Sequence, residues 1–217
     1  ASKEDVFVAL DIAPTGLTPS LSGADSYREA YGAYRDIFLC APEDAYDLIL
    51  FETFMDLYEL RAAIIAAKEI TDKPIIATLT FEEGGRLLTG ADPLTCVSVL
   101  EALGVKALGV NCGFGPDVSV KILRQLSAYS SLPLIFSPNA GLPVSLNGRT
   151  HFSCSPSDFI KFTEEAASLG ALYFGGCCGT TPEYISLLSE KCSGITPSPP
   201  SKKFFTSASS GTRTCVF

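Results

Sequence analysis

Three of the eight cysteines in this chain follow short apolar runs, at points where a β-strand would end. Cys112 comes just after the run 107–110, and the adjacent pair Cys177 and Cys178 follows the run 171–174 after two glycines. Thiolates are favoured ligands of Zn²⁺, and three protein ligands with a fourth position left open are typical of catalytic zinc sites. The residue types therefore indicate a candidate zinc site made of these three thiols.

The same cysteines allow other interpretations. The sequence has no Cys-x-x-Cys motif, and Cys112 stands far from the pair, so it lacks a local zinc signature. Cys177 and Cys178 could instead form a strained vicinal disulfide or a redox pair. The glycines around them could simply pack closely or form an anion-binding nest. The remaining cysteines are interpreted as packing or incidental thiols: Cys40, Cys96, Cys154, Cys192 and Cys215.

Polar residues end three of the other apolar runs. Glu52 follows the run 48–51, where its carboxylate could bind a helix N-terminus. A carboxylate in that position is costly to bury without a cation, so substrate binding is the other interpretation. Asn139, in a Pro-Asn-Ala-Gly segment, and Asp11, at the end of the run 6–12, are further candidates for substrate binding. Each of these two could also serve only as a turn or cap residue.

Six apolar runs separate segments with helical character along most of the chain. Most runs are continuous rather than alternating, which is typical of strands that are covered on both faces in a parallel sheet. Repeated βα units fit a (β/α)8 barrel or an open doubly wound sheet, and no GxGxxG motif follows the first run to favour the open sheet. We therefore predict the barrel, although only six strands are visible: 6–12, 48–51, 75–81, 107–110, 134–136 and 171–174.

Two kinds of signal mark the helices between these strands. Leu60, Ala63, Ile64 and Ala67 share one face of a helix by their spacing. Three helix starts are predicted where a side chain able to cap the first turn precedes a proline, whose missing N–H costs nothing at that position. These starts are Asp92-Pro93, Ser155-Pro156 and Thr181-Pro182.

Composition excludes several classes of protein. The chain has 24 acidic and 16 basic residues, a net charge of −8, which argues against a nucleic-acid-binding surface. Apolar residues make up 47%, too many for a disordered chain. No apolar run is long enough for a membrane span and no signal peptide is recognisable, so we expect a cytoplasmic protein. The single His151 lies in a polar segment, which disfavours a Ser-His-Asp or Cys-His hydrolase.

Three separate motifs, in this order, carry a resemblance to a known family: Gly-Val-Asn-Cys-Gly-Phe-Gly-Pro at 109–116, Pro-Asn-Ala-Gly-Leu-Pro at 138–143 and Gly-Gly-Cys-Cys-Gly-Thr-Thr-Pro at 175–182. Together they resemble the homocysteine S-methyltransferase domain, over roughly Val6 to Cys192. The segments 51–56 and 78–90 resemble the branch found in cobalamin-dependent methionine synthases.

The resemblance implies a (β/α)8 barrel that transfers a methyl group to the thiol of homocysteine, giving methionine. It implies that Cys112, Cys177 and Cys178 hold zinc and that Asn139 lies beside the metal, able to occupy its open position. It also implies that Glu52 holds the amino group of homocysteine. In the methionine synthase branch the donor is methylcobalamin on another domain, recharged from methyltetrahydrofolate on a third, so cobalamin- and folate-binding domains are the expected partners.

The chain also departs from the family pattern. The Gly-rich first strand motif and the second strand motif of the family are both missing. We therefore expect residues 1–192 to form an incomplete homocysteine-binding barrel of about six βα units. Residues 193–217 begin rich in Ser and Pro and are expected to be a poorly packed linker toward a following domain.

Three alternatives remain open at the level of sequence. The chain could be a non-catalytic, truncated zinc-binding barrel. It could be a homocysteine methyltransferase that uses another donor, such as betaine or S-methylmethionine. It could also be a thiol redox protein that uses the Cys177–Cys178 pair.

Overall fold

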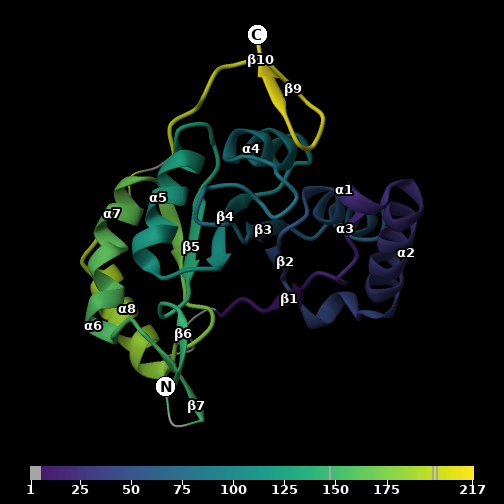
Figure 1. The fold of residues 1–217 in the computed structure, drawn as a ribbon. Helices are drawn as coiled ribbons and strands as arrows, with labels where there is room; N and C mark the ends of the chain where they lie inside the picture. Colours follow the sequence, from purple (N-terminus) through teal and green to yellow (C-terminus); the bar gives the residue numbers. More distant parts are fainter. Residues whose placement is uncertain (1–5, 147, 197, 199) are drawn as a thin grey trace.

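The computed structural model describes residues 6–146, 148–196, 198 and 200–217. At its centre is a parallel sheet of six strands, around which the helices are arranged (Figure 1). The strands lie in the order β1-β2-β3-β4-β5-β8, so each one pairs with the next strand of the sheet along the chain. Their bounds are β1 Ala9–Ile12, β2 Leu48–Phe54, β3 Ile75–Leu79, β4 Ala107–Cys112, β5 Leu134–Pro138 and β8 Ala171–Phe174.

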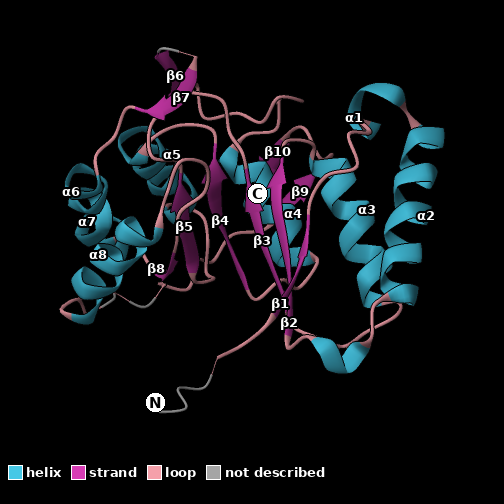
Figure 2. Cartoon of the chain, turned by 90° about the horizontal axis from the view of Figure 1, so that it is seen from below, coloured by secondary structure: helices cyan, strands magenta, loops and turns pink. Residues whose placement is uncertain are grey.

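Helices connect consecutive strands and flank the sheet on both sides of the view in Figure 2. Sequential order with helical crossovers is the topology of a barrel rather than of a doubly wound sheet, in which the strand order reverses. Within the described residues β1 and β8 each pair on one side only, so the fold is a partial barrel, as predicted. The helices are α1 Pro19–Ser22, α2 Ala24–Cys40, α3 Leu57–Lys68, α4 Pro93–Ala102, α5 Pro116–Ser127, α6 Pro156–Phe159, α7 Thr163–Ser168 and α8 Pro182–Ser193, with short 3₁₀ turns at Glu43–Ala45 and Ile160–Phe162.

The core lies between the sheet and these helices. Ile49, Phe51 and Leu108 of the central strands are fully buried, which explains their continuous apolar runs. The predicted face of α3 is confirmed, because Leu60, Ala63, Ile64 and Ala67 are all fully buried. Burying each large aliphatic side chain contributes about 1.5–3 kcal/mol.

The predicted helix starts are confirmed in position, with one difference in mechanism. The Asp92 side chain accepts a hydrogen bond from the Thr95 N–H at 2.9 Å, and Ser155 accepts one from the Asp158 N–H at 3.2 Å. Thr181 occupies the N-cap of α8, but its side chain makes no cap hydrogen bond. Pro182, at the first helical position, is therefore the residue that marks this start.

The first two strands differ from their predicted ranges. β1 begins at Ala9, and the preceding Val6, Phe7 and Val8 are exposed and lie outside the sheet. β2 continues past Phe51 to Phe54 and contains an irregularity, because Phe51 pairs with Ala77 whereas Phe54 pairs with Leu79. Three steps on β2 thus match two on β3, which is a β-bulge and places Glu52 and Thr53 inside it.

The C-terminal segment has no buried residue among those described, but its end forms a hairpin that contacts a helix, which its composition does not predict. Its strands β9 Ser207–Ser209 and β10 Thr214–Val216 form an antiparallel hairpin beside α4. Hydrogen bonds join Ser207 to Ser98 at 3.3 Å and Thr214 to Thr95 at 3.1 Å. The hydroxyl groups of these residues thus connect the hairpin to α4, although a segment rich in such residues is typical of a linker. The expected domain boundary at residue 192 stays a prediction.

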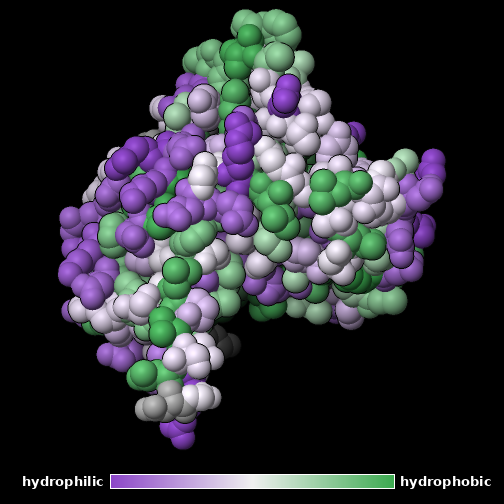
Figure 3. Space-filling model, in the orientation of Figure 1, coloured by the Kyte–Doolittle hydropathy of each residue, from purple (hydrophilic) through white to green (hydrophobic). Residues whose placement is uncertain are grey.

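A second hairpin extends from the end of β5. Its strands β6 Pro143–Leu146 and β7 Arg149–Phe152 extend away from the central sheet (Figure 1). Most of their residues are exposed. The space-filling view shows apolar residues gathered over the C-terminal hairpin and polar ones over the flank formed by α5 and α7 (Figure 3). Among the described residues, no helix has both the length and the apolar character needed to cross a membrane.

Candidate metal centre

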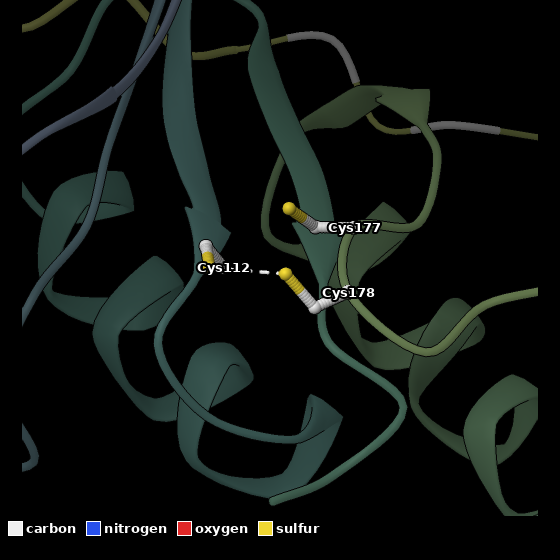
Figure 4. Close-up of side chains that lie close together, drawn as sticks. All are labelled: Cys112, Cys177 and Cys178. Atoms are coloured by element: carbon white, nitrogen blue, oxygen red, sulfur yellow. Dashed lines mark hydrogen bonds between the residues drawn. The ribbon is translucent and has the colours of Figure 1, made fainter. Parts of the chain in front are cut away.

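Three thiols converge at one edge of the sheet, where the parallel strands end. Cys112 is the last residue of β4, and Cys177 and Cys178 lie in the loop after β8 (Figure 4). The three Sγ atoms lie within 4.8 Å of one another, and those of Cys112 and Cys178 are 3.8 Å apart. The structure therefore brings together the three cysteines that the sequence selects.

Strand β5 lies between β4 and β8 and fixes how the two cysteine segments are aligned along the strand direction. Cys112 is paired with Pro138 of β5 in the sheet register. On the other side the Cys177 N–H donates to the Pro138 carbonyl at 2.9 Å. Both cysteine segments are thus tied by backbone contacts to the same residue of the central strand.

Tight turns aim the sulfur atoms at one another. Cys112 has φ = 58°, a left-handed conformation that is uncommon for a residue with a side chain. After the pair, Gly179 has φ = 81°, and a Cβ there would lie 2.2 Å from the Phe152 ring, so only glycine fits. The Thr180 hydroxyl closes this turn by donating to the Cys177 carbonyl at 2.7 Å.

Asn139 lies between the two cysteine segments and is buried. Its Oδ1 accepts a hydrogen bond from the Cys178 N–H at 2.9 Å, and its Nδ2 donates to the Gly113 carbonyl at 3.4 Å. In this structure the Asn139 amide therefore holds the loops that carry the thiols. Its expected place in the open position of a metal stays a prediction.

The electrostatics of the three thiols favour one thiolate. A hydrogen bond from the Cys177 thiol is the main cause that lowers the pKa of Cys112 to about 5. The same interaction with Cys112 is the main cause that raises the pKa of Cys177. Burial, followed by the charge of Cys112, raises the pKa of Cys178. The cluster alone holds one negative charge easily, and a cation is needed to deprotonate all three thiols.

The donor set fits a tetrahedral thiolate metal site. Two sulfurs bound to zinc at about 2.3 Å in tetrahedral geometry are about 3.8 Å apart, which is the separation of the Cys112 and Cys178 sulfurs. All eight cysteines are free thiols, so no disulfide joins Cys177 to Cys178. Cys178 is exposed and the other two cysteines are half-buried, so the cluster lies near the surface.

Two carboxylates lie on β2 and β1, which pair with each other and are separated from β4 by β3. Glu52 is half-buried in the bulge of β2, and Asp11 is exposed near the end of β1. Burial raises the pKa of Asp11; burial, followed by the charges of Asp11 and Cys112, raises the pKa of Glu52. Neither side chain forms an ion pair or hydrogen bond with the described residues. The pair therefore suits a ligand that brings its own positive charge.

Other candidates lie away from this centre. His151, for which no role is predicted, lies on the exposed strand β7. Cys96 is fully buried in α4, and burial is the main cause that raises its pKa. Cys40 and Cys215 are exposed in other parts of the structure.

Sequence reasoning missed two residues that touch the centre. Asn111 is buried at the end of β4, and its amide hydrogen-bonds to Thr53 in the bulge of β2. The available signal was a lone amide side chain in an otherwise apolar run, since a buried amide requires partners. Thr53 gave no such signal, because its unusual backbone depends on contacts with another strand.

Two sequence comparisons bear on this arrangement. The family model described as homocysteine S-methyltransferase matches residues 1–192. The chain is 31% identical to a methionine synthase of Mycobacterium leprae (strain TN) and 32% identical to that of Mycobacterium tuberculosis (strain ATCC 25618 / H37Rv), in each case over 185 residues and 82% of this chain. It spans only 15% of the length of these relatives.

Solved structures show the same fold. The apo form of the homocysteine methyltransferase MmuM from Escherichia coli gives a TM-score of 0.70 at 22% identity, covering 86% of this chain and 62% of that one. The metallated form of the same enzyme gives 0.65 at 23% identity, covering 86% and 61%. At these identities the likeness supports the barrel architecture, whereas the sequence matches carry the family. The chain belongs to the homocysteine S-methyltransferase family.

Proposed function

We propose that this chain binds Zn²⁺ through Cys112, Cys177 and Cys178 and that a homocysteine thiol takes the fourth position and is methylated to methionine. The observation that carries the proposal is the convergence of three sulfurs, all within 4.8 Å, in a member of this family. Three thiolates with one accessible position form the ligand set of a catalytic rather than a structural zinc site.

Different residues of the chain would bind the thiol end and the ammonium end of homocysteine. When bound, zinc lowers the pKa of the homocysteine thiol, so that the sulfur reacts as a thiolate. Glu52 and Asp11 would hold the ammonium group, because their carboxylates have no partner among the described residues and their pKa values are raised. The homocysteine sulfur then attacks the methyl carbon and forms a C–S bond. The bond from that carbon to the donor breaks, and its electron pair leaves with the donor.

The donor we propose is methylcobalamin carried by another region of a longer protein. The similarity to two proteins named methionine synthase, of which this chain spans 15%, supports this choice. Cobalamin- and folate-binding regions are accordingly the proposed partners. Methylation with methylcobalamin, S-methylmethionine and betaine, tested side by side, distinguishes this choice from the alternative donors.

We also place the protein in the cytoplasm. All eight cysteines are free, and reduced thiols are the usual state in that compartment. Fractionation of cells followed by thiol labelling of the protein tests this assignment, which a secreted or oxidised protein would contradict.

Zinc analysis of the reduced chain tests the metal site. We expect one zinc per chain in the wild type and at least a hundredfold weaker binding in a Cys177→Ser variant. Cys192→Ser is the matched control, because Cys192 is a half-buried thiol on α8 that is not part of the cluster. No zinc in the wild type, or unchanged zinc in Cys177→Ser, would contradict the proposal.

A second candidate is a zinc-binding barrel without activity of its own. The pairing of β1 and β8 on one side only, within the described residues, favours it. Calorimetric titration of the zinc-loaded chain with homocysteine separates the two functions. Binding supports the methyltransferase function, whereas zinc without homocysteine binding supports the second candidate.

A further inference from the structure

Asn111 is a buried amide whose hydrogen bonds reach across the sheet. Its Oδ1 accepts from the Thr53 N–H at 2.9 Å, and its Nδ2 donates to the Thr53 hydroxyl at 2.7 Å. The Thr80 hydroxyl of the loop after β3 donates to the Asn111 carbonyl at 3.0 Å. Strand β3 lies between β2 and β4, so the Asn111 side chain connects strands that are not paired with each other.

Thr53 is held in an unfavourable conformation. It has φ = 67°, in the left-handed region, which is an outlier for a β-branched residue. Such a conformation costs on the order of a factor of ten or more in population and persists only where surrounding contacts enforce it. The backbone N–H and the hydroxyl of Thr53 are both bonded to the Asn111 amide, so this amide stabilises the bulge.

The same amide also points at the thiol cluster. Asn111 Nδ2 lies 3.8 Å from the Cys177 sulfur, within range of a weak N–H···S hydrogen bond. Outer partners of metal ligands orient those ligands and tune metal affinity. One buried side chain therefore contacts both the residue next to Glu52 and one of the three sulfurs.

We propose that Asn111 is a positioning residue that sets the separation between the Glu52 carboxylate and the thiol cluster. This inference rests on the proposed function, in which Glu52 holds the ammonium group and the thiols hold the metal that receives the substrate sulfur. Because both ends of the amino acid are then anchored, that separation selects for its length. Asn111 thereby favours homocysteine over cysteine, which has one methylene group fewer.

Variants of the two residues test this role. Asn111→Ala removes both sets of contacts. The double variant Asn111→Ala/Thr53→Gly replaces Thr53 by glycine, which adopts the left-handed conformation without strain. It does not restore the contact between residue 111 and Cys177. Thr71→Val is the matched control, because it removes a buried threonine hydroxyl bonded to Glu43 at the opposite end of the sheet.

Four kinds of measurement report on the two halves of the centre and on stability. Zinc affinity is measured by competition with a chromophoric chelator, and the thiolate-to-metal absorption band is recorded after loading with Co²⁺. Dissociation constants for homocysteine and for cysteine are measured by calorimetry at saturating zinc. Thermal unfolding of every variant shows how much stability each substitution removes.

We expect Asn111→Ala to lower zinc affinity about tenfold and to shift the Co²⁺ absorption band. At saturating zinc it should lower homocysteine affinity about tenfold while changing cysteine affinity much less. The double variant should recover homocysteine affinity and its preference over cysteine, but not zinc affinity. Thr71→Val should lose stability without changing either affinity.

The outcomes separate this inference from the function on which it rests. If the wild type fails to bind zinc or homocysteine, the proposed function is wrong and this role falls with it. If the wild type binds both and Asn111→Ala keeps its zinc affinity and its preference for homocysteine, only the positioning role is overturned. Equal losses for homocysteine and cysteine, with no recovery in the double variant, would likewise reduce Asn111 to a structural residue.

Discussion

The two sides of the candidate centre are built in different ways. On the thiol side, formed by Cys112, Cys177, Cys178 and Asn139, the loops are tied to one another by hydrogen bonds at 2.9 Å to Pro138 and Asn139. On the acid side, formed by Asp11 and Glu52, the carboxylates have no partner among the described residues. One side is preorganised by the chain, and the other is left with unpaired charge.

The difference indicates that the thiol side supplies affinity for the metal and the acid side supplies affinity for the substrate. Preorganised thiols need little rearrangement to accept a metal, so their contribution appears as metal affinity and as stability of the loaded protein. Unpaired, partly desolvated carboxylates weaken the empty protein and gain a partner only when a cationic ligand arrives. A change to a carboxylate of the acid side that weakened metal binding as much as substrate binding would break this comparison.

Metal removal should have the largest effect. Free zinc at about a thousand times its dissociation constant stabilises the folded state by about 4 kcal/mol, so a chelator should lower the melting temperature by several degrees. Differential scanning calorimetry with and without chelator measures this shift. A Cys112→Ser variant should melt at the same temperature in both conditions; a persistent shift there would place the metal elsewhere.

Glu52→Gln should act on substrate and leave the metal unchanged. Loss of a charged hydrogen bond costs about 1.5–3 kcal/mol, so homocysteine affinity should fall roughly ten- to a hundredfold at constant zinc affinity. Calorimetric titration of the zinc-loaded variant provides both values. A parallel loss of zinc affinity would show that the acid and thiol sides are not separate.

Asp11→Asn should have a smaller effect of the same kind. Asp11 is more exposed than Glu52, so water screens its interaction with an ammonium group and about a threefold loss of homocysteine affinity is expected. The same titration measures it. An effect larger than that of Glu52→Gln would reverse the assigned order of the two carboxylates.

The smallest effect concerns the stability of the zinc-free protein. Because the pKa of Glu52 is raised on folding, the folded state favours its protonated form, and its ionised form destabilises the fold above that pKa. Glu52→Gln should therefore stabilise the protein at pH 7 by about 0.5 kcal/mol, a value kept small by solvent screening. The gain should disappear as the pH falls below the pKa of Glu52. Urea unfolding at pH 7 and pH 4 provides the comparison, and a gain that grows on acidification would contradict it.

The sequence predicted the thiol side better than the acid side. Apolar runs located the six strands, and the carboxyl ends of parallel strands share one edge, so Cys112 and Cys177 could be expected to meet. The bulge at Glu52 and Thr53 could not be expected, because the left-handed Thr53 is stabilised by Asn111 on another strand. Local preferences describe one segment at a time, whereas this conformation depends on a contact between two.

The C-terminal hairpin is a second case in which local sequence preferences did not predict a contact between two segments. Ser and Pro made the segment after residue 192 look like an unattached linker, and its pairing with α4 depends on hydroxyls that face partners such as Thr95 and Ser98. A polar residue is a poor indicator of an unattached segment, because its side chain can form hydrogen bonds with polar side chains of another element.

The strand order has a consequence for how the protein folds. Each strand of the sheet pairs with the strand just before it in the sheet, but the paired residues are far apart in sequence, as Ala9 and Leu48 are. Each pairing therefore closes a long loop, which makes parallel sheets slow to form. Cys112 is in place once β4 has been added, but Cys177 and Cys178 arrive only with β8, the last strand. A metal that needs all three sulfurs therefore binds tightly only after β8 has paired with β5, and its binding stabilises that pairing.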